Sequence, residues 1–278
     1  MTTPDIATPA DRQGRPESDS LRRLSEVGGS AMALMQVALG IATLVVWQLA
    51  SDRLVPDYMI SNPLSVVQRL WLWISTGSIM VHILATLHAA IAGFLIGSAI
   101  GILGGIWLGL SPFFSRLLNP YIWAFNSLPK VALVPLFVLW FGLGINSKIA
   151  LAAVLVVFLV FVSTYSGVRE VDSELVDSLR LMRAKRHHIL TKVVLPSATS
   201  WIFAGLKVAV PYSLIGAIIG ELVAANRGLG YLVQRSGAEF DTAGVFAALV
   251  VIAVLAMVFN GLVVSLQGRL ERWKIVGR

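Results

Sequence analysis

Six long runs of hydrophobic residues, separated by shorter polar segments, dominate the chain. Each run has about the 20 residues that an α-helix needs to cross a hydrocarbon core about 30 Å thick. The runs are Ala31–Ala50, His82–Leu110, Pro120–Gly142, Ile149–Ser166, Ala204–Val223 and Ala243–Gln267. Because they are continuously apolar rather than alternating, they predict helices and not the strands of a membrane barrel. The pattern therefore predicts an all-α membrane protein with about six transmembrane helices.

Composition supports this class and excludes several kinds of chemistry. Of the 278 residues, 56% are hydrophobic and 13% are charged, and the mean hydropathy is +0.79. The absence of cysteine excludes disulfides, thiolate metal sites and a thiol nucleophile. His82 and His88 are six positions apart and His187 and His188 are adjacent, so neither pair has chelating spacing and no metal site is expected. Without paired intramembrane carboxylates, an intramembrane hydrolase is not expected either.

The basic residues predict how the chain is oriented. With the N-terminus in the cytoplasm, fifteen Lys and Arg residues lie on the cytoplasmic side and five on the other, as the positive-inside rule requires. The net charge of +7 is therefore interpreted as a topology signal and not as a nucleic-acid footprint. The predicted regions are a disordered cytoplasmic tail at 1–30 without a cleaved signal, a transmembrane domain at 31–268 that includes a basic loop at 167–200, and a basic cytoplasmic tail at 269–278.

The second run contains five glycines at intervals of four residues. They are Gly93, Gly97, Gly101, Gly105 and Gly109. This spacing places them along one stripe of a helix, where the missing side chains let another membrane helix approach closely. Two interpretations stay open, a contact with another subunit or the pore, and tight packing inside one bundle.

The third run is interrupted by Pro120, Pro129 and Pro135. Proline removes a backbone donor and disturbs the helical hydrogen bonds. Such breaks at membrane depth are tolerated only inside protein or beside water. The third run therefore predicts a broken membrane segment.

Four polar residues are candidates for a substrate pathway. Asn126, Ser127 and Lys130 lie at the break, and Glu221 lies near the end of the fifth run. Ionisable residues at membrane depth are costly and suggest function. Two other interpretations are equally open. In the first, the Lys130 side chain extends to the membrane interface, and in the second, Glu221 is an interfacial residue.

The basic loop contains an amphipathic helix. Leu175, Leu179 and Met182 recur at helical spacing, and Asp172 or Ser173 is placed to cap the helix start. The helix is predicted to end before the Leu-Pro step that closes the loop. On the residues alone, it either lies on anionic lipid or docks a soluble partner with its apolar face.

This loop resembles the loop that begins Glu-Ala-Ala in the permeases of binding-protein-dependent ABC importers. Asp177-Ser178-Leu179 stands in place of Glu-Ala-Ala, and Val194-Leu195-Pro196 matches the Leu-Pro end. Arg183 stands where the family has a glycine between two short helices. The arginine is expected to extend the first helix or to change its exit angle.

The resemblance extends over most of the chain from Leu54 onward. Further segments look like the branch of the family that transports sulfonates, taurine, nitrate or bicarbonate. They are Ser61–Pro63, Gly109–Ser111, Leu133–Leu136, Leu139–Gly144, Ser147–Ile149, Glu221–Ala225, Arg227–Leu232 and Ser236–Phe240.

The resemblance implies a type I ABC importer permease-like fold with a cytoplasmic coupling helix, located in the bacterial inner membrane. Leu175, Leu179 and Met182 are then expected to fill a groove of the ATPase, with Asp177 and Arg180 paired at its rim. The residues expected to contact the ATPase are Glu174, Leu175, Val176, Asp177, Ser178, Leu179, Arg180, Met182, Arg183, Ala184 and Lys185, with Leu195 and Pro196 at the loop end.

The implied partners are two ATPase subunits, an extracytoplasmic solute-binding protein and a second permease subunit, expected to be a second copy of this chain. No Gly-x-x-x-x-Gly-Lys-Ser/Thr loop occurs in the sequence, so this chain is not expected to be an enzyme or to hold a cofactor. ATP and Mg²⁺ are expected in the partner.

The predicted function is a translocation pathway for a small solute, expected to be an anion, with taurine or another sulfonate favoured over nitrate, bicarbonate and small heterocycles. The alternatives are a secondary transporter driven by an ion gradient and a channel or scaffold subunit. Only the importer requires ATP and a second chain, so a reconstitution with and without an ATPase discriminates the three.

Overall fold

A computed structural model describes residues 29–51 and 56–270. The predicted tails at 1–30 and 269–278 lie outside the described residues except at their inner ends, where residues 29–30 and 269–270 are helical. Within the described ranges the regular structure is helical and contains no strand, in agreement with the predicted all-α class. The chain divides into two units at Pro56, and each is described by itself.

The first unit contains helix α2 (Gly29–Ser51). Its 21 residues from Ala31 to Ser51 are long and apolar enough to cross a membrane. The apolar side chains along it are exposed to the surroundings, which suits lipid as the outer solvent.

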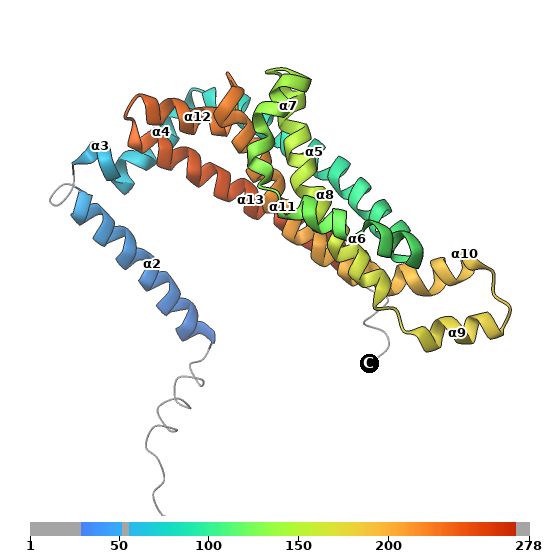
Figure 1. Ribbon diagram of the computed structural model, residues 1–278. Helices are drawn as coiled ribbons and strands as arrows, with labels where there is room; N and C mark the ends of the chain where they lie inside the picture. The colour runs from blue at the N-terminus through green and yellow to red at the C-terminus, as the bar shows by residue number, and fades with distance from the viewer. Residues whose placement is uncertain (1–28, 52–55, 271–278) are drawn as a thin grey trace, which may run out of the picture. The chain divides into compact units, whose positions relative to one another are not determined.

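The second unit is a helical bundle with short helices at both ends (Figure 1). Its elements are α3 (Asp57–Ile60), α4 (Pro63–Ser75), α5 (Ser78–Gly109), α6 (Pro112–Ser127), a 3₁₀ turn (Lys130–Leu133), α7 (Val134–Phe141), α8 (Ile145–Arg169), α9 (Ser173–Leu181), α10 (Arg186–Ile189), a π segment (Leu190–Val194), α11 (Leu195–Ala224), α12 (Leu229–Ala238) and α13 (Thr242–Leu270). Figure 1 shows α9 and α10 at one end of the bundle, which we call the loop end. The opposite end carries α4, α7 and α12.

The described residues contain five helices that are long and apolar enough to span a membrane, and a sixth if a bent pair is counted as one span. The bent pair is Pro112–Ser127 with Lys130–Phe141, and its two parts meet at 83°. Pro129 occupies the break and Pro135 lies in the first turn of α7, where a missing amide leaves no helical hydrogen bond unmade. The predicted interruption of the third run is therefore a sharp bend.

The glycine stripe of α5 packs against α8 of the same bundle. At each of the five glycines, an added Cβ would occupy space already filled by an α8 residue. These α8 residues are Ala152, Val156, Val160, Thr164 and Val168, which themselves recur every four positions. The contacts thus support packing within one bundle, and the two helices approach as small-residue membrane pairs do.

The fifth span is longer than predicted. The helical segment runs without a gap from Arg186 through the Leu195-Pro196 step to Ala224, over 39 residues. The Leu195 amide bonds to the carbonyl of Leu190, five residues back, in the π segment just before Pro196. This wider turn accommodates the proline ring. The predicted amphipathic helix, α9, does end before the Leu-Pro step, at Leu181, and a separate helical segment runs through the step.

Candidate functional site

The loop end is built around the short helix α9. The side chain of Asp172 caps its start by accepting a hydrogen bond from the Glu174 amide at 2.8 Å. Glu174 lies in the first turn and Arg180 in the last, which suits the helix dipole. A local capping signal and favourable end charges therefore explain why this polar segment forms a helix.

The apolar side chains of α9 differ in how far they are exposed. Leu175 is 53% exposed, Met182 is 77% exposed, and Leu179 is only partly exposed. Leu181, which was not among the predicted contacts, is 85% exposed. The outward apolar surface therefore centres on Leu181 and Met182, at the C-terminal end of the helix.

Arg183 ends α9 in place of a glycine. It adopts φ 55°, the left-handed conformation that glycine takes without strain. The Arg183 amide donates to the Arg180 carbonyl at 2.9 Å, and the Ala184 amide donates to the Leu179 carbonyl at 3.0 Å. Of the two expected effects of Arg183, an extended helix is wrong, because these bonds close the turn and hold the arginine in the glycine's conformation. The other, a changed exit angle, stays a prediction.

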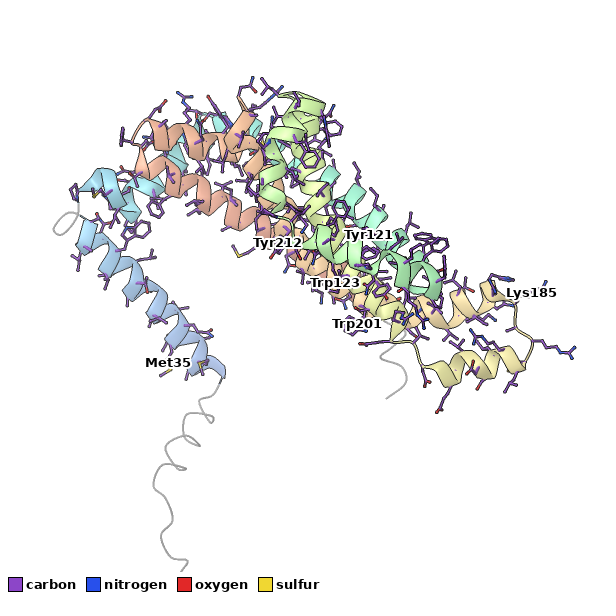
Figure 2. All side chains as sticks on the ribbon, viewed as in Figure 1. Met35, Tyr121, Trp123, Lys185, Trp201 and Tyr212 are labelled. Carbon is purple, nitrogen blue, oxygen red and sulfur yellow. The ribbon has the colours of Figure 1, made fainter. Side chains whose placement is uncertain are left out.

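Charged side chains surround this apolar surface. Asp177 and Arg180 form an ion pair at 3.0 Å, with both side chains exposed. Arg183, Lys185 and Arg186 follow and are exposed. Figure 2 shows Lys185 at the tip of the loop end, extending away from the bundle.

The opposite end contains a buried polar cluster around Glu221, which is 3% exposed. The Thr86 hydroxyl donates to the Glu221 carboxylate, with oxygen distances of 2.8 and 2.9 Å. The Gly230 amide donates to the same carboxylate at 2.8 Å, and the Leu229 amide donates to the Thr86 hydroxyl oxygen at 2.8 Å. Glu221 thus joins α11 to α5 and to the first residues of α12, and its carboxylate is buried inside the protein.

A second bond ties the start of α12 to α5. The Gly228 amide donates to Nδ1 of His82 at 3.1 Å. Gly228 has φ 121°, a conformation open to glycine but strained for other residues. The His82 ring also stacks on Tyr231, with 5.8 Å between the ring centroids.

Lys148 is the second buried charged residue of this end, at 6% exposure. Its ammonium group donates to the carbonyls of Leu143 at 2.6 Å, Gly144 at 2.9 Å and Ala224 at 2.5 Å. All three N–H donors of the lysine are therefore used. They hold the start of α8 against the last residue of α11.

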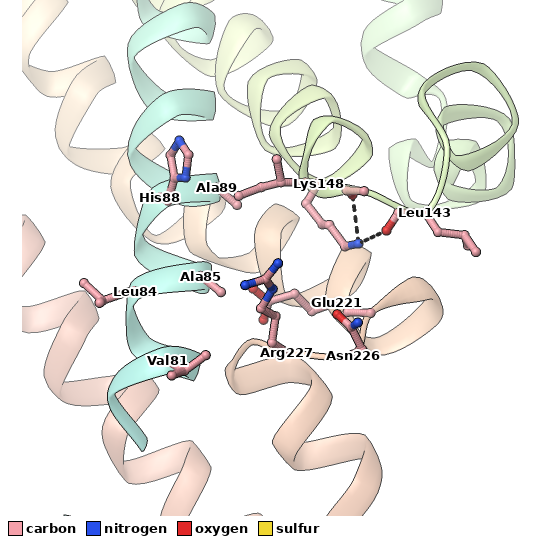
Figure 3. A pocket seen from close by; sticks show the side chains of 13 residues that line it. Val81, Leu84, Ala85, His88, Ala89, Leu143, Lys148, Glu221, Asn226 and Arg227 are labelled. Carbon is pink, nitrogen blue, oxygen red and sulfur yellow. Dashed lines mark hydrogen bonds between the residues drawn. The ribbon is translucent and has the colours of Figure 1, made fainter. Parts of the chain in front are cut away.

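A pocket of about 490 Å³ lies beside these two charged residues. Its lining combines an apolar wall with several polar groups, as Figure 3 shows. The lining residues are Val81, Leu84, Ala85, His88, Ala89, Leu143, Gly144, Ile145, Lys148, Glu221, Ala225, Asn226 and Arg227. Arg227 is exposed and forms no hydrogen bond or ion pair within the described part of the chain.

The other predicted pathway residues lie elsewhere. Asn126, Ser127 and Lys130 are not among the lining residues of this pocket. The Lys130 ammonium bonds to the Asn126 carbonyl at 2.8 Å and lies 4.8 Å from the centroid of the Phe158 ring. Ser127 bonds to the Trp123 carbonyl in its own helix at 2.9 Å. The structure therefore brings Lys130 to Asn126 but does not join either to Glu221 through the pocket.

Sequence reasoning did not identify Thr86, Lys148 or Arg227 as site residues. Thr86 is a lone hydroxyl inside an apolar run, and its partner Glu221 is 135 positions away. Lys148 was assigned to an outer segment, although a lysine next to a span start was a signal for a buried cation. Arg227 lies three residues before Gly230, whose amide donates to the Glu221 carboxylate.

Comparison with known proteins identifies relatives along most of the chain. Residues 97–275 match the family described as "Binding-protein-dependent transport system inner membrane component". The formylaminopyrimidine transport permease protein ThiX of Halalkalibacterium halodurans is 31% identical, covering 88% of this chain and 98% of that protein. The taurine transport system permease protein TauC of Escherichia coli is 32% identical, covering 86% of this chain and 90% of that protein.

Solved structures share the fold. The MetNI methionine ABC transporter in an inward-facing conformation contains a chain that matches with a TM-score of 0.60 at 20% identity. The match covers 68% of this chain and 94% of that one. The predicted type I importer permease-like fold is confirmed at the level of architecture.

Proposed function

The chain belongs to the binding-protein-dependent transport system inner-membrane components, the permease subunits of ABC importers, and we propose that its two ends divide the work of transport. The loop end receives the motion of a separate ATPase subunit. The opposite end admits a small organic anion through the pocket beside Arg227. The observation that carries the proposal is the pair of outward apolar side chains, Leu181 and Met182, held at the tip of a capped polar helix.

These side chains suit a protein partner. Leu181 and Met182 are 85% and 77% exposed and lie among charged residues. Burying one such side chain in a partner's groove contributes about 1.5–3 kcal/mol. The short helix with its apolar anchors follows the helix-in-groove mode of recognition. ATP and Mg²⁺ belong to that partner, because this sequence has no phosphate-binding loop.

The pocket at the opposite end favours an anion with an apolar body. The donors of Lys148 and the carboxylate of Glu221 are already engaged by carbonyls, a hydroxyl and an amide. Arg227 remains as an unpaired cation at the pocket, facing an apolar wall that includes Val81, Leu84 and Ala85. A guanidinium binds planar or tetrahedral oxyanions with two parallel hydrogen bonds.

Names of relatives narrow the substrate class. Among the similar permeases are one for taurine and a putative one for aliphatic sulfonates, and others for riboflavin and a formylaminopyrimidine. The unpaired arginine favours the sulfonates, which combine a negative head with an aliphatic body. Nitrate and bicarbonate are the smaller anions that the same arginine would accept.

The proposed assembly is that of a bacterial inner-membrane importer. It contains two permease subunits, two ATPase subunits and an extracytoplasmic solute-binding protein, with the loop end in the cytoplasm. We propose two copies of this chain as the permease pair. Both chain ends would then be cytoplasmic, as the distribution of basic residues favours.

Cross-linking to the ATPase tests the docking surface. Because the chain has no native cysteine, Met182→Cys introduces a single reactive thiol. A maleimide that carries a photoactivatable benzophenone is expected to link this position to the ATPase in the assembled complex on illumination. Arg235→Cys, exposed on α12 at the opposite end, is the matched control and should give no link. Equal linking from both positions, or from neither, contradicts the proposed docking.

A further inference from the structure

Helix α4 is too short to span a membrane, yet it carries three distinct faces. Its 13 residues extend about 20 Å at 1.5 Å per residue, less than the hydrocarbon thickness of about 30 Å. One face packs on the bundle through Val66, which is 5% exposed, and through Trp73, which packs against the cluster around Leu229 and Leu232. The other two faces point away from the bundle.

The second face of α4 is an apolar stripe. Val67, Trp71 and Ile74 are 61%, 71% and 61% exposed. At about 100° per residue, these three positions fall within about 60° of one another around the helix. Leu64, 60% exposed, lies at the edge of the same stripe.

The third face is polar. Gln68 and Ser75, both exposed, fall next to the stripe on the side away from Val66 and Trp73, while Ser65 and Arg69 are partly buried and lie nearer the bundle. Leu72, 50% exposed, is the exception among them. A helix with one protein face, one apolar face and one polar face matches three surroundings at once, which are a bundle, a hydrocarbon layer and water.

Two connections hold α4 at the level where membrane spans begin. Thr76 and Gly77 alone separate its end from the first residue of α5, and Gly77 turns the chain with φ 69°. Arg69 forms an ion pair at 3.0 Å with Asp241, the residue immediately before α13. Since α5 and α13 both have the length and hydropathy of spans, their shared starting level marks the boundary between hydrocarbon and water.

From this placement we infer that α4 is an interfacial helix that lies on the bilayer surface, with Val67, Trp71 and Ile74 inserted among the lipid chains. Tryptophan is enriched at this depth because its ring is apolar while its N–H remains hydrated. An amphipathic helix in the interface buries its apolar face to a depth of about 5–10 Å. The inserted helix would anchor the layer formed by α4 and α12, and with it the rim of the pocket, to one leaflet.

Spin labels at single cysteines test the inference in the assembled transporter in liposomes. The native chain has no cysteine, so each label reports on one position. Labels at positions 67, 71 and 74 should collide more often with oxygen, which concentrates in lipid, than with a water-soluble nickel chelate. Labels at 68 and 75 should show the reverse, and a label at Leu95, 60% exposed in the middle of α5, is the lipid reference.

Two other outcomes overturn the inference. Frequent collisions with the nickel chelate at 67, 71 and 74 would place the stripe in water. Low collision rates with both reagents would mean that protein covers the stripe, either α2 or a second copy of the chain. Trp71→Phe provides a readout without a label, because it should remove part of the fluorescence quenching by brominated lipids. Unchanged quenching in that variant also counts against lipid insertion.

Discussion

The two ends of the bundle use their polar residues in opposite ways. At the loop end, the contacts of α9 are local, since its cap and its ion pair join residues two and three positions apart, and its apolar side chains face outward. At the opposite end, Glu221 and Lys148 are buried and bind groups up to 135 positions away. The first arrangement leaves a surface free for a partner, while the second fixes three helices and a short fourth one to each other. The difference suggests that motion enters at one end while the other end keeps a defined pocket.

Breaking the buried end should have the largest effect. Glu221→Ala leaves the Thr86 hydroxyl and the Gly230 amide without their acceptor. Two unsatisfied buried donors cost about 3 kcal/mol or more together. The variant should therefore lose stability, measured as a clear fall in melting temperature in detergent.

Glu239→Ala is the matched control for that variant. Glu239 is an exposed carboxylate at the C-terminal end of α12, paired with Arg235 at 2.9 Å. Its removal should leave the melting temperature nearly unchanged, because exposed ion pairs contribute little. Similar losses from both substitutions would show that burial of Glu221 is not what stabilises this end.

Breaking the exposed end should leave stability intact and weaken assembly. Leu181→Asp places a charge where the proposed groove requires an apolar group. Losing about 2 kcal/mol of apolar burial corresponds to about a thirtyfold weaker affinity for the ATPase. Leu181→Met keeps the apolar volume and should retain binding. If the Leu181→Asp variant binds the ATPase as tightly as the native chain does, Leu181 is not part of the interface.

A smaller effect is expected from a substitution that changes the backbone strain at the loop end. Arg183→Gly should relieve the left-handed strain, which costs about 1 kcal/mol for a residue with a side chain. Hydrogen exchange at the Ala184 amide, which bonds to the Leu179 carbonyl, should then slow by about fivefold. Arg183→Ala retains the strain and should give no such protection. Faster exchange in the glycine variant would mean that the arginine itself stabilises the turn.

The smallest effect is expected at the exposed ion pair. Asp177→Asn removes the partner of Arg180, and both side chains are about two-thirds exposed, at 63% and 68%. The expected change in unfolding free energy is below about 0.5 kcal/mol. A larger change, measured by thermal denaturation in detergent, would show that the two ends differ less than their contacts indicate.

Local patterns in the sequence predicted much of the architecture. The hydrophobic runs located the spans because hydropathy over about 20 residues is a property of one segment. The Asp172 cap and the bend at Pro129 were likewise predictable from neighbouring residues. The glycine spacing predicted a close helix contact, but only the structure identifies α8 as the partner.

Local sequence patterns could not predict the contacts at the opposite end, around the pocket. The contact between Thr86 and Glu221 depends on how α5 and α11 are packed, and nothing near either residue in the sequence encodes it. The burial of Lys148 depends on the Ala224 carbonyl, 76 positions later. Arg183 misled for a different reason, since backbone hydrogen bonds on both sides of it outweigh the intrinsic preference of arginine for a helix.

Uptake into sealed vesicles tests the central claim most directly. The chain would be reconstituted alone or together with its ATPase and solute-binding protein. ATP would be supplied or withheld on the side of the membrane where the ATPase lies. The labelled solutes would be taurine, an aliphatic sulfonate, riboflavin and a formylaminopyrimidine. The account predicts uptake only when the ATPase, the binding protein and ATP are all present. Uptake by this chain alone, with no nucleotide and no second protein, would contradict it.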